Sequence, residues 1–205
     1  FPFSKTQLLI NRISAIDSFK GKWHTLEKRE SKYLKELKRI ATIESSGSST
    51  RIEGATLTDV EIEKLLNNLK VTQFESRDEQ EVIGYYQALK LILDNYDTID
   101  LTENYIRQLH SILLKESKKD KRHRGDYKKI TNKVVAKYPD GTKKVIFNTT
   151  EPHLVDKEMS ELINWVNDQL SKNDIHPLVL IATFVYEFLS IHPFQDGNGR
   201  LSRLM

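Results

Sequence analysis

The sequence predicts a mainly α-helical protein, a helical bundle built around one buried central helix and carrying a single β-hairpin. Three observations lead to this prediction. Apolar residues recur at helical spacing along most of the 205-residue chain. Residues 177–190 are apolar on nearly every side, which is typical of a buried helix. Only residues 133–147 combine short β-branched runs with a Pro-Asp-Gly turn, which is typical of a hairpin.

The N-terminal residues are predicted to form a helical extension, residues 1–40, ahead of a main domain at residues 41–205. A first helix is expected to begin near Ser4 and to be interrupted by Gly21. A second, heavily charged helix is expected over residues 23–40, with its lysines and glutamates forming a solvated face.

The composition of the next stretch predicts a loop. Residues 45–50 read Ser-Ser-Gly-Ser-Ser-Thr, and these residue types favour caps and turns over helix interiors. Gly54 would then be the residue that follows the end of a helix.

Three further helices are predicted from their N-terminal signals. Thr58 to Glu61 and Ser76 to Glu79 form two capping boxes, and Thr102 caps the third helix. His110 lies beside the apolar stripe of that third helix, and we interpret it as structural.

The remaining segments lead to the central helix. The run from Lys115 to Arg124 holds six Lys and Arg residues without an aromatic residue, which is typical of a solvated loop rather than a nucleic-acid patch. Strands are expected at residues 133–137 and 143–147, and a helix after Thr150 and Pro152. The apolar segment 177–190 is too short to span a bilayer, and it leads directly to His192.

Composition excludes several function classes. The chain has 32 basic and 29 acidic residues, a net charge of +3, so the overall charge indicates neither a nucleic-acid partner nor a membrane. Cysteine is absent, which excludes disulfides and thiol chemistry and fits a cytoplasmic protein. No secretory signal is visible. No helix stop signal precedes Met205, so we expect the natural protein to continue beyond it.

The stretch from His192 to Arg203 carries chemistry. His192 is a candidate general base, and Asp196 is a hard oxygen ligand suited to Mg²⁺. Residues 197–199, Gly-Asn-Gly, can form a backbone nest for an anion. Arg200 and Arg203 would share one helical face within reach of a polyphosphate. The combination favours phosphoryl or nucleotidyl transfer over an ordinary turn, although no Walker loop is present.

Residues 192–203 resemble the signature of the Fic family, HxFx[D/E]GNGRxxR, throughout its length. The resemblance implies an all-helical enzyme that transfers AMP from Mg-ATP to a Ser, Thr or Tyr hydroxyl of a target protein. It implies that His192 deprotonates the hydroxyl, that Phe194 anchors the loop and that Asp196 binds magnesium.

The same resemblance assigns the phosphate contacts. Gly197, Asn198 and Gly199 would cradle phosphates, and Arg200 and Arg203 would contact the β- and γ-phosphates. The Doc branch, which phosphorylates its targets, has a lysine where this chain has Gly199, so the sequence follows the AMP-transferring pattern.

The Ser49–Gly54 stretch resembles the [S/T]xxxE[G/N] inhibitory motif of Fic proteins. The resemblance implies an inhibitory segment at residues 45–54, in which Ser49 and Glu53 hold the enzyme inactive. Glu53 is expected to pair with Arg203 and to occupy, in bidentate fashion, the fork that otherwise binds the γ-phosphate.

The hairpin at residues 133–147 resembles in position the flap of Fic proteins, and we expect a target segment to bind along it by β-augmentation. Two other functions stay open: removal of AMP with Glu53 orienting a water, and ATP binding by a regulatory module without turnover. His192 argues against the second, since a pure binder needs no base. A homodimer is possible.

Overall fold

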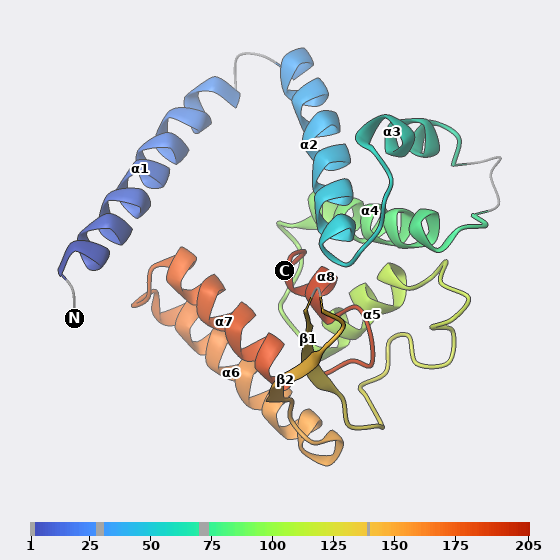
Figure 1. Ribbon diagram of the computed structural model, residues 1–205. Coiled ribbons are helices and arrows are strands. Elements are labelled where there is room, and N and C mark those ends of the chain that lie inside the picture. The colour runs from blue at the N-terminus through green and yellow to red at the C-terminus, as the bar shows by residue number, and fades with distance from the viewer. Residues whose placement is uncertain (1–2, 28–30, 70–73, 139) are drawn as a thin grey trace. The chain divides into compact units, whose positions relative to one another are not determined.

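The computed structural model describes residues 3–27, 31–69, 74–138 and 140–205. The chain divides into two compact units, Phe1–Thr42 and Ile43–Met205. Among the described residues the fold is mainly helical with one two-stranded hairpin, which confirms the predicted fold class (Figure 1).

The first unit contains helix α1, Phe3–Glu27, and the first part of α2, Ser31–Ile52. The predicted interruption at Gly21 is wrong, because α1 runs through it. An interior glycine costs a helix only about 1 kcal/mol relative to alanine, so a single glycine does not end it. The predicted helix over residues 23–40 is divided between α1 and α2, and residues 28–30 lie outside the described residues.

The predicted loop at residues 45–50 is also wrong, because α2 continues to Ile52. Ser46, Ser49 and Thr50 are buried, so small side chains are needed here for packing. The Thr50 hydroxyl donates to the Ser46 carbonyl at 2.7 Å, which satisfies it within the helix.

Helix α2 ends in the way that Gly54 predicts. Gly54 has φ +103°, and its N–H donates to the Arg51 carbonyl at 3.0 Å. The N–H of Ala55 donates to the Thr50 carbonyl at 3.1 Å, which completes a Schellman motif. Glu53 is therefore the last residue before the chain turns away from the helix axis.

The three helices with N-terminal signals form as predicted. Both capping boxes are present, at Thr58 and at Ser76, and the Thr102 hydroxyl accepts from the N–H of Tyr105. The helices are α3 Asp59–Asn67, α4 Arg77–Asn95 and α5 Glu103–Leu113.

Strands β1, Lys133–Lys137, and β2, Lys143–Asn148, pair antiparallel with an irregularity between Val134 and Val135. The predicted hairpin is confirmed. The N–H of Gly141 donates to the Tyr138 carbonyl at 3.0 Å and closes the turn, while the role expected of Pro139 lies outside the described residues.

A 3-10 turn, Pro152–Leu154, leads into α6, Val155–Lys172, which lies beside the central helix α7, Pro177–Ile191. Helix α7 buries one face, and its other side carries exposed apolar residues, so burial all round is not observed. The buried residues are Leu180, Phe184, Phe188 and Ile191; Val179, Ile181 and Tyr186 are exposed.

Two apolar clusters stabilise the second unit. The larger cluster holds residues of α4, α5, α6 and α7, together with Phe194 and Leu201 after α7. The smaller cluster holds Ile43 and residues of α3 and α4. Among the described residues no helix combines the length and apolarity that crossing a bilayer requires.

Candidate active site

His192 lies directly after α7, in a left-handed backbone conformation with φ 53° and ψ 60°. Its N–H donates to the Phe188 carbonyl at 2.9 Å, which ends the helix there. The ring Nδ1 is 3.4 Å from the Leu189 carbonyl. Because a carbonyl only accepts, this contact favours the tautomer that carries its proton on Nδ1. The Nε2 lone pair is then free to accept a proton.

Burial is the largest influence on the His192 imidazole and lowers its pKa below the ordinary value. The Lys128 ammonium lowers it further, while the contact with Leu189, Glu53 and Asp196 act in the opposite direction. The net effect keeps His192 neutral near pH 7, which is the state a general base needs.

Phe194 anchors the loop that follows His192. Its ring is fully buried and stacks on the His110 ring with centroids 3.8 Å apart. The side-chain amide of Asn198 pairs with both backbone groups of Phe194, accepting from its N–H at 2.9 Å and donating to its carbonyl at 2.8 Å. Asn198 therefore uses its side chain to hold the loop, and only its backbone is available to a ligand.

His110, on α5, contacts the same loop through Phe194 and Asp196. Its Nδ1 accepts from the N–H of Gly125 at 2.8 Å, so the ring proton is on Nε2, which lies 3.0 Å from the Asp196 carbonyl. Burial lowers the pKa of His110 to about 4. His110 is thus a neutral residue: the Gly125 N–H holds its ring, and its Nε2 proton holds the Asp196 carbonyl.

Asp196 is partly exposed to solvent, and its neighbours favour the ionised carboxylate. Its Oδ1 accepts from the Gly197 N–H at 2.6 Å and from Arg200 at 3.2 Å, and its Oδ2 accepts from Lys119 at 3.4 Å. Burial alone would raise its pKa, but Arg200, the Gly197 N–H and Lys119 together lower it below the usual value.

This carboxylate fits a magnesium ion. The Lys119 ammonium beside Oδ2 shows that this oxygen faces a position where a cation is favoured. Across the described residues no group of three or more His, Cys, Asp or Glu side chains could hold a metal. Mg²⁺ would therefore depend on Asp196, waters and substrate phosphates, which is a usual arrangement for this ion.

Gly197 has φ +82° and precedes the short helix α8, Asn198–Ser202. A Cβ at Gly197 would contact Leu113 at 3.4 Å, so the loop passes close to α5. At Gly199 a Cβ would lie 2.4 Å from Oε1 of Glu53. The glycine backbone thus lies directly against the Glu53 carboxylate.

Arg200 and Arg203, which were expected on one helical face, bind different partners. Arg200 is 2% exposed and lies between Asp196 and Glu81 of α4, whose Oε2 is 3.5 Å from Nη1. Its Nε and Nη1 have no hydrogen-bond partner among the described residues. These two nitrogens retain hydrogen-bonding capacity, which is costly to leave unused in a buried position.

Arg203 instead binds the end of α2. Its Nε donates to the Ser49 hydroxyl at 2.8 Å, and its Nη2 donates to the Ser49 carbonyl at 3.0 Å and to Oε1 of Glu53 at 2.7 Å. The expected bidentate geometry is wrong, because Glu53 accepts only through Oε1, from Nη2, while Nε donates to Ser49. The structure nonetheless joins Ser49, Glu53 and Arg203.

Sequence reasoning missed three residues of this site: Glu81, Lys119 and Lys128. Lys119 and Lys128 belong to a strongly basic stretch, and no local pattern separates them from solvated lysines. Glu81 follows the acidic first turn of α4, Asp78 and Glu79, and no local pattern separates it from those residues.

A family model described as Fic/DOC family matches residues 100–205. The curated relatives include the protein adenylyltransferase Fic of Drosophila grimshawi and that of Drosophila melanogaster, each 29% identical over 174 residues. Each alignment covers 84% of this chain and 33% of the relative, so the chain spans about a third of the length of these relatives.

Solved structures give the same result. A Fic domain containing signaling protein from Bacteroides thetaiotaomicron superimposes with a TM-score of 0.77 at 28% identity, covering 92% of this chain and 69% of that one. Fic-1 from C. elegans superimposes with a TM-score of 0.78 at 22% identity, covering 99% of this chain and 56% of that one. The second likeness concerns the fold alone.

Proposed function

The chain belongs to the Fic/DOC family, and on this basis we propose that it transfers AMP from Mg-ATP to a Ser, Thr or Tyr hydroxyl of a target protein. The observation that carries the proposal is His192, whose unprotonated Nε2 lies on the same short loop as Asp196 and the glycine nest. A base next to a phosphate-binding loop suits nucleotidyl transfer.

In the proposed reaction, Nε2 of His192 accepts the proton of the target hydroxyl. The hydroxyl oxygen then forms a bond to the α-phosphorus of ATP, and the bond to the β-phosphate oxygen breaks to release pyrophosphate. The backbone at residues 197–199 and the side chains of Arg200 and Arg203 hold the phosphates. Mg²⁺ on Asp196 would supply the positive charge that offsets the phosphates.

We further propose that Glu53 restrains this reaction. Its carboxylate and Ser49 together hold the guanidinium of Arg203, and its Oε1 lies against Gly199. A γ-phosphate that needs Arg203 would compete with a carboxylate of like charge. Losing one charge-assisted contact weakens ATP by only about 1.5–3 kcal/mol. A misplacement of the α-phosphate by about 1 Å can cost a hundredfold in rate.

One observation favours removal of AMP as a second candidate function. Oε2 of Glu53 makes no hydrogen bond within the described residues, and the side chain is 38% exposed. This oxygen is available to orient a water for attack on an AMP-modified side chain.

The test is AMP transfer by the Glu53→Gly protein, followed with α-labelled ATP and a cell extract as acceptor. We expect labelling of protein to rise far more than ATP affinity rises. The matched control is Glu44→Gln, which changes an exposed glutamate of the same helix and should leave labelling unchanged. His192→Ala added to Glu53→Gly should abolish labelling while ATP binding is retained, since general-base loss costs about 10²–10⁴ in rate.

Other outcomes contradict the proposal. Labelling with γ-labelled ATP would indicate phosphoryl transfer. Release of AMP from a modified protein by the parent, lost in Glu53→Gln, would favour the second candidate. Equal labelling by the parent and Glu53→Gly proteins at saturating Mg-ATP, on any acceptor including the enzyme itself, would exclude inhibition by Glu53.

A further inference from the structure

Lys128 is a buried lysine that the proposed reaction does not use. It is 3% exposed, whereas lysines are almost never fully buried without a partner. Burial lowers its pKa to about 8, and the charged groups that act against this shift are Glu151 and Glu158. Near pH 7 its ammonium is therefore still mostly charged, although no carboxylate accepts a hydrogen bond from it.

All three donors of this ammonium are used. Nζ donates to Oδ1 of Asn132 at 3.0 Å, to the hydroxyl of Thr149 at 2.7 Å and to the carbonyl of Ile191 at 3.1 Å. The Thr149 hydroxyl also lies 2.6 Å from Oδ1 of Asn132. These four side-chain and backbone groups form one closed polar cluster.

The partners belong to two functional parts of the molecule. Asn132 immediately precedes β1 and Thr149 immediately follows β2, so they are the two ends of the hairpin. Ile191 is the last residue of α7 and precedes His192. Lys128 therefore connects the two ends of the hairpin to Ile191, the residue directly before His192.

Two further bonds hold the chain on the other side of His192. The backbone N–H of Lys128 donates to the Pro193 carbonyl at 2.8 Å, and Nδ2 of Asn132 donates to the Phe194 carbonyl at 3.1 Å. Three carbonyls around His192 thus accept from Lys128 or Asn132. This restraint suits a histidine whose left-handed backbone is uncommon for a non-glycine residue.

We infer that Lys128 is a positioning residue: its ammonium fixes the two ends of the hairpin to the loop of His192, so that a target segment paired on the hairpin presents its hydroxyl at a set distance from the base. The positions of the hairpin ends and of the His192 loop follow from the hydrogen bonds of Lys128. The effect on the target hydroxyl rests on the proposed function. A lysine suits the position because an ammonium supplies three donors, and a neutral side chain of similar length cannot.

The ammonium also acts on His192 through space. Lys128 lowers the pKa of His192, whereas Glu53 and Asp196, the carboxylates that act on the same ring, raise it. Removing the Lys128 charge should therefore raise the pKa of His192. Loosening of the cluster that leaves the His192 ring buried would not raise this pKa, whereas exposure of the ring would raise it in either variant, because burial is its largest lowering influence.

The experiment compares Lys128→Met and Thr149→Val in the full chain carrying Glu53→Gly, with Lys129→Met as the matched control at an exposed neighbour. We measure kcat and KM for protein labelling, ATP affinity, and the pKa of His192 by NMR titration of its ring protons. Lys128→Met should lower kcat about a hundredfold, in line with a misplacement of about 1 Å. ATP affinity should stay within about twofold, because the cluster touches none of the phosphate-binding groups.

The variants separate charge from geometry. Lys128→Met should raise the pKa of His192, whereas Thr149→Val should lower kcat without raising that pKa, and Lys129→Met should change neither. An unchanged kcat in both Lys128→Met and Thr149→Val would overturn the inference. So would a parallel loss of kcat and ATP affinity, which would indicate a merely structural role.

The inference and the proposed function can fail separately. If no protein labelling is found in the parent background, the proposed function fails. The positioning role then stands or falls on two NMR readouts: the pKa of His192 and the nuclear Overhauser contacts that the His192 ring protons make with neighbouring side chains. If both are unchanged in Lys128→Met, the inference is overturned. If Lys128→Met does not fold, changed ring contacts in Thr149→Val support the positioning role, and unchanged ring contacts overturn it.

Discussion

At the scale of single residues, the candidate site depends on which atoms of each side chain are already occupied. His192 has a proton on Nδ1 and a free Nε2, while Asn198 has both ends of its amide engaged by Phe194. Arg203 is occupied by Ser49 and Glu53. A ligand can therefore bind His192 directly. It can bind Asn198 only through the backbone, and Arg203 only by displacing Glu53.

The first prediction concerns pH. A protonated imidazole cannot accept a proton, so transfer should fall as the pH falls through the pKa of His192. Burial places that pKa below its ordinary value of about 6.5, so the acid limb of kcat/KM should have its midpoint below about pH 6.5. The measurement uses Glu53→Gly, where loss of a carboxylate that raises this pKa moves the midpoint further down. ATP affinity measured over the same range is the control; a midpoint at or above 6.5 contradicts the prediction.

At the scale of elements, α4 and α5 pass each other at a distance that only glycine allows. A Cβ built on Gly84 would lie 1.9 Å from the Leu113 carbonyl oxygen, which is backbone and cannot rotate away. The crossing positions Glu81, which is one turn earlier on α4, against Arg200. It also positions His110, on α5, beneath Phe194.

The second prediction tests this crossing. Gly84→Ala should destabilise the protein by about 3 kcal/mol through overpacking, which lowers the melting midpoint by roughly 6–12 °C for a chain of this size. Gly21→Ala is the matched control, since nothing lies within 4 Å of a Cβ there and alanine favours a helix. Thermal unfolding followed by circular dichroism measures both. A Gly84→Ala midpoint equal to that of the parent would show that the helices separate at no cost.

The third prediction concerns the hairpin as a binding element. Strand β2 is exposed along its whole length, and its outer residues include the apolar Val145, Ile146 and Phe147. Replacing residues 134–147 by a short Gly-Ser linker retains Asn132 and Thr149, so the cluster around Lys128 is preserved. We expect unchanged ATP affinity and loss of target labelling, because the pairing edge is removed. Labelling that persists at the parent level would show that the hairpin only connects Lys128 to α6.

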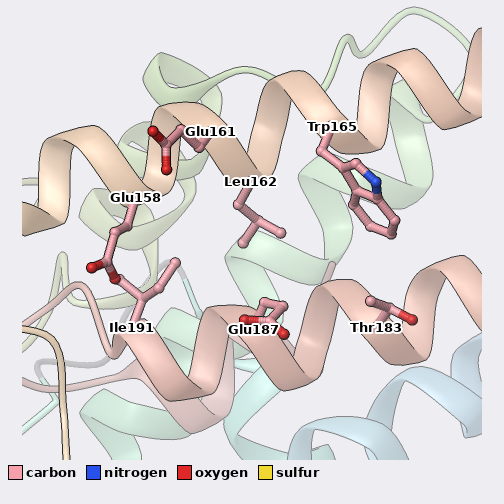
Figure 2. Close-up of a pocket in the computed structure, with 7 residues that line it drawn as sticks. All are labelled: Glu158, Glu161, Leu162, Trp165, Thr183, Glu187 and Ile191. Atoms are coloured by element: carbon pink, nitrogen blue, oxygen red, sulfur yellow. The ribbon is translucent and has the colours of Figure 1, made fainter.

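At the scale of the whole molecule, the described core residues and the candidate site residues belong to the second unit, Ile43–Met205. Both apolar clusters consist of described residues from Ile43 onward. The candidate site residues also begin after that point, at Ser49. A cavity of about 530 Å³ between α6 and α7 ends at Ile191, next to the candidate base, and is lined in part by Glu158, Glu161 and Glu187 (Figure 2).

The fourth prediction follows from the position of the core and the candidate site in the second unit. Removing residues 1–30 should leave ATP affinity unchanged and should shift the melting midpoint of the main transition by no more than a few degrees, because no described core residue is lost. Isothermal titration with Mg-ATP and calorimetry measure the two quantities. A large loss of either would indicate that the first unit supports the second.

The sequence alone determined the features that depend on neighbouring residues. The capping boxes at Thr58 and Ser76 and the turn of the hairpin form from local hydrogen bonds, so their patterns predict them directly. The stretch from His192 to Arg203 is likewise contiguous, and its residue types indicate phosphate chemistry before any fold is known.

Tertiary structure decided the features that depend on distant partners. The serine-rich end of α2 is helical because it is buried, which overrides the preference of serine for turns. Arg200 is buried because Glu81, more than a hundred residues earlier, lies against it. Unlike Lys129, Lys128 is buried, and Asn132, Thr149 and Ile191 accept hydrogen bonds from its three donors. Local sequence carries no record of such contacts, since their partners come together only when the helices pack.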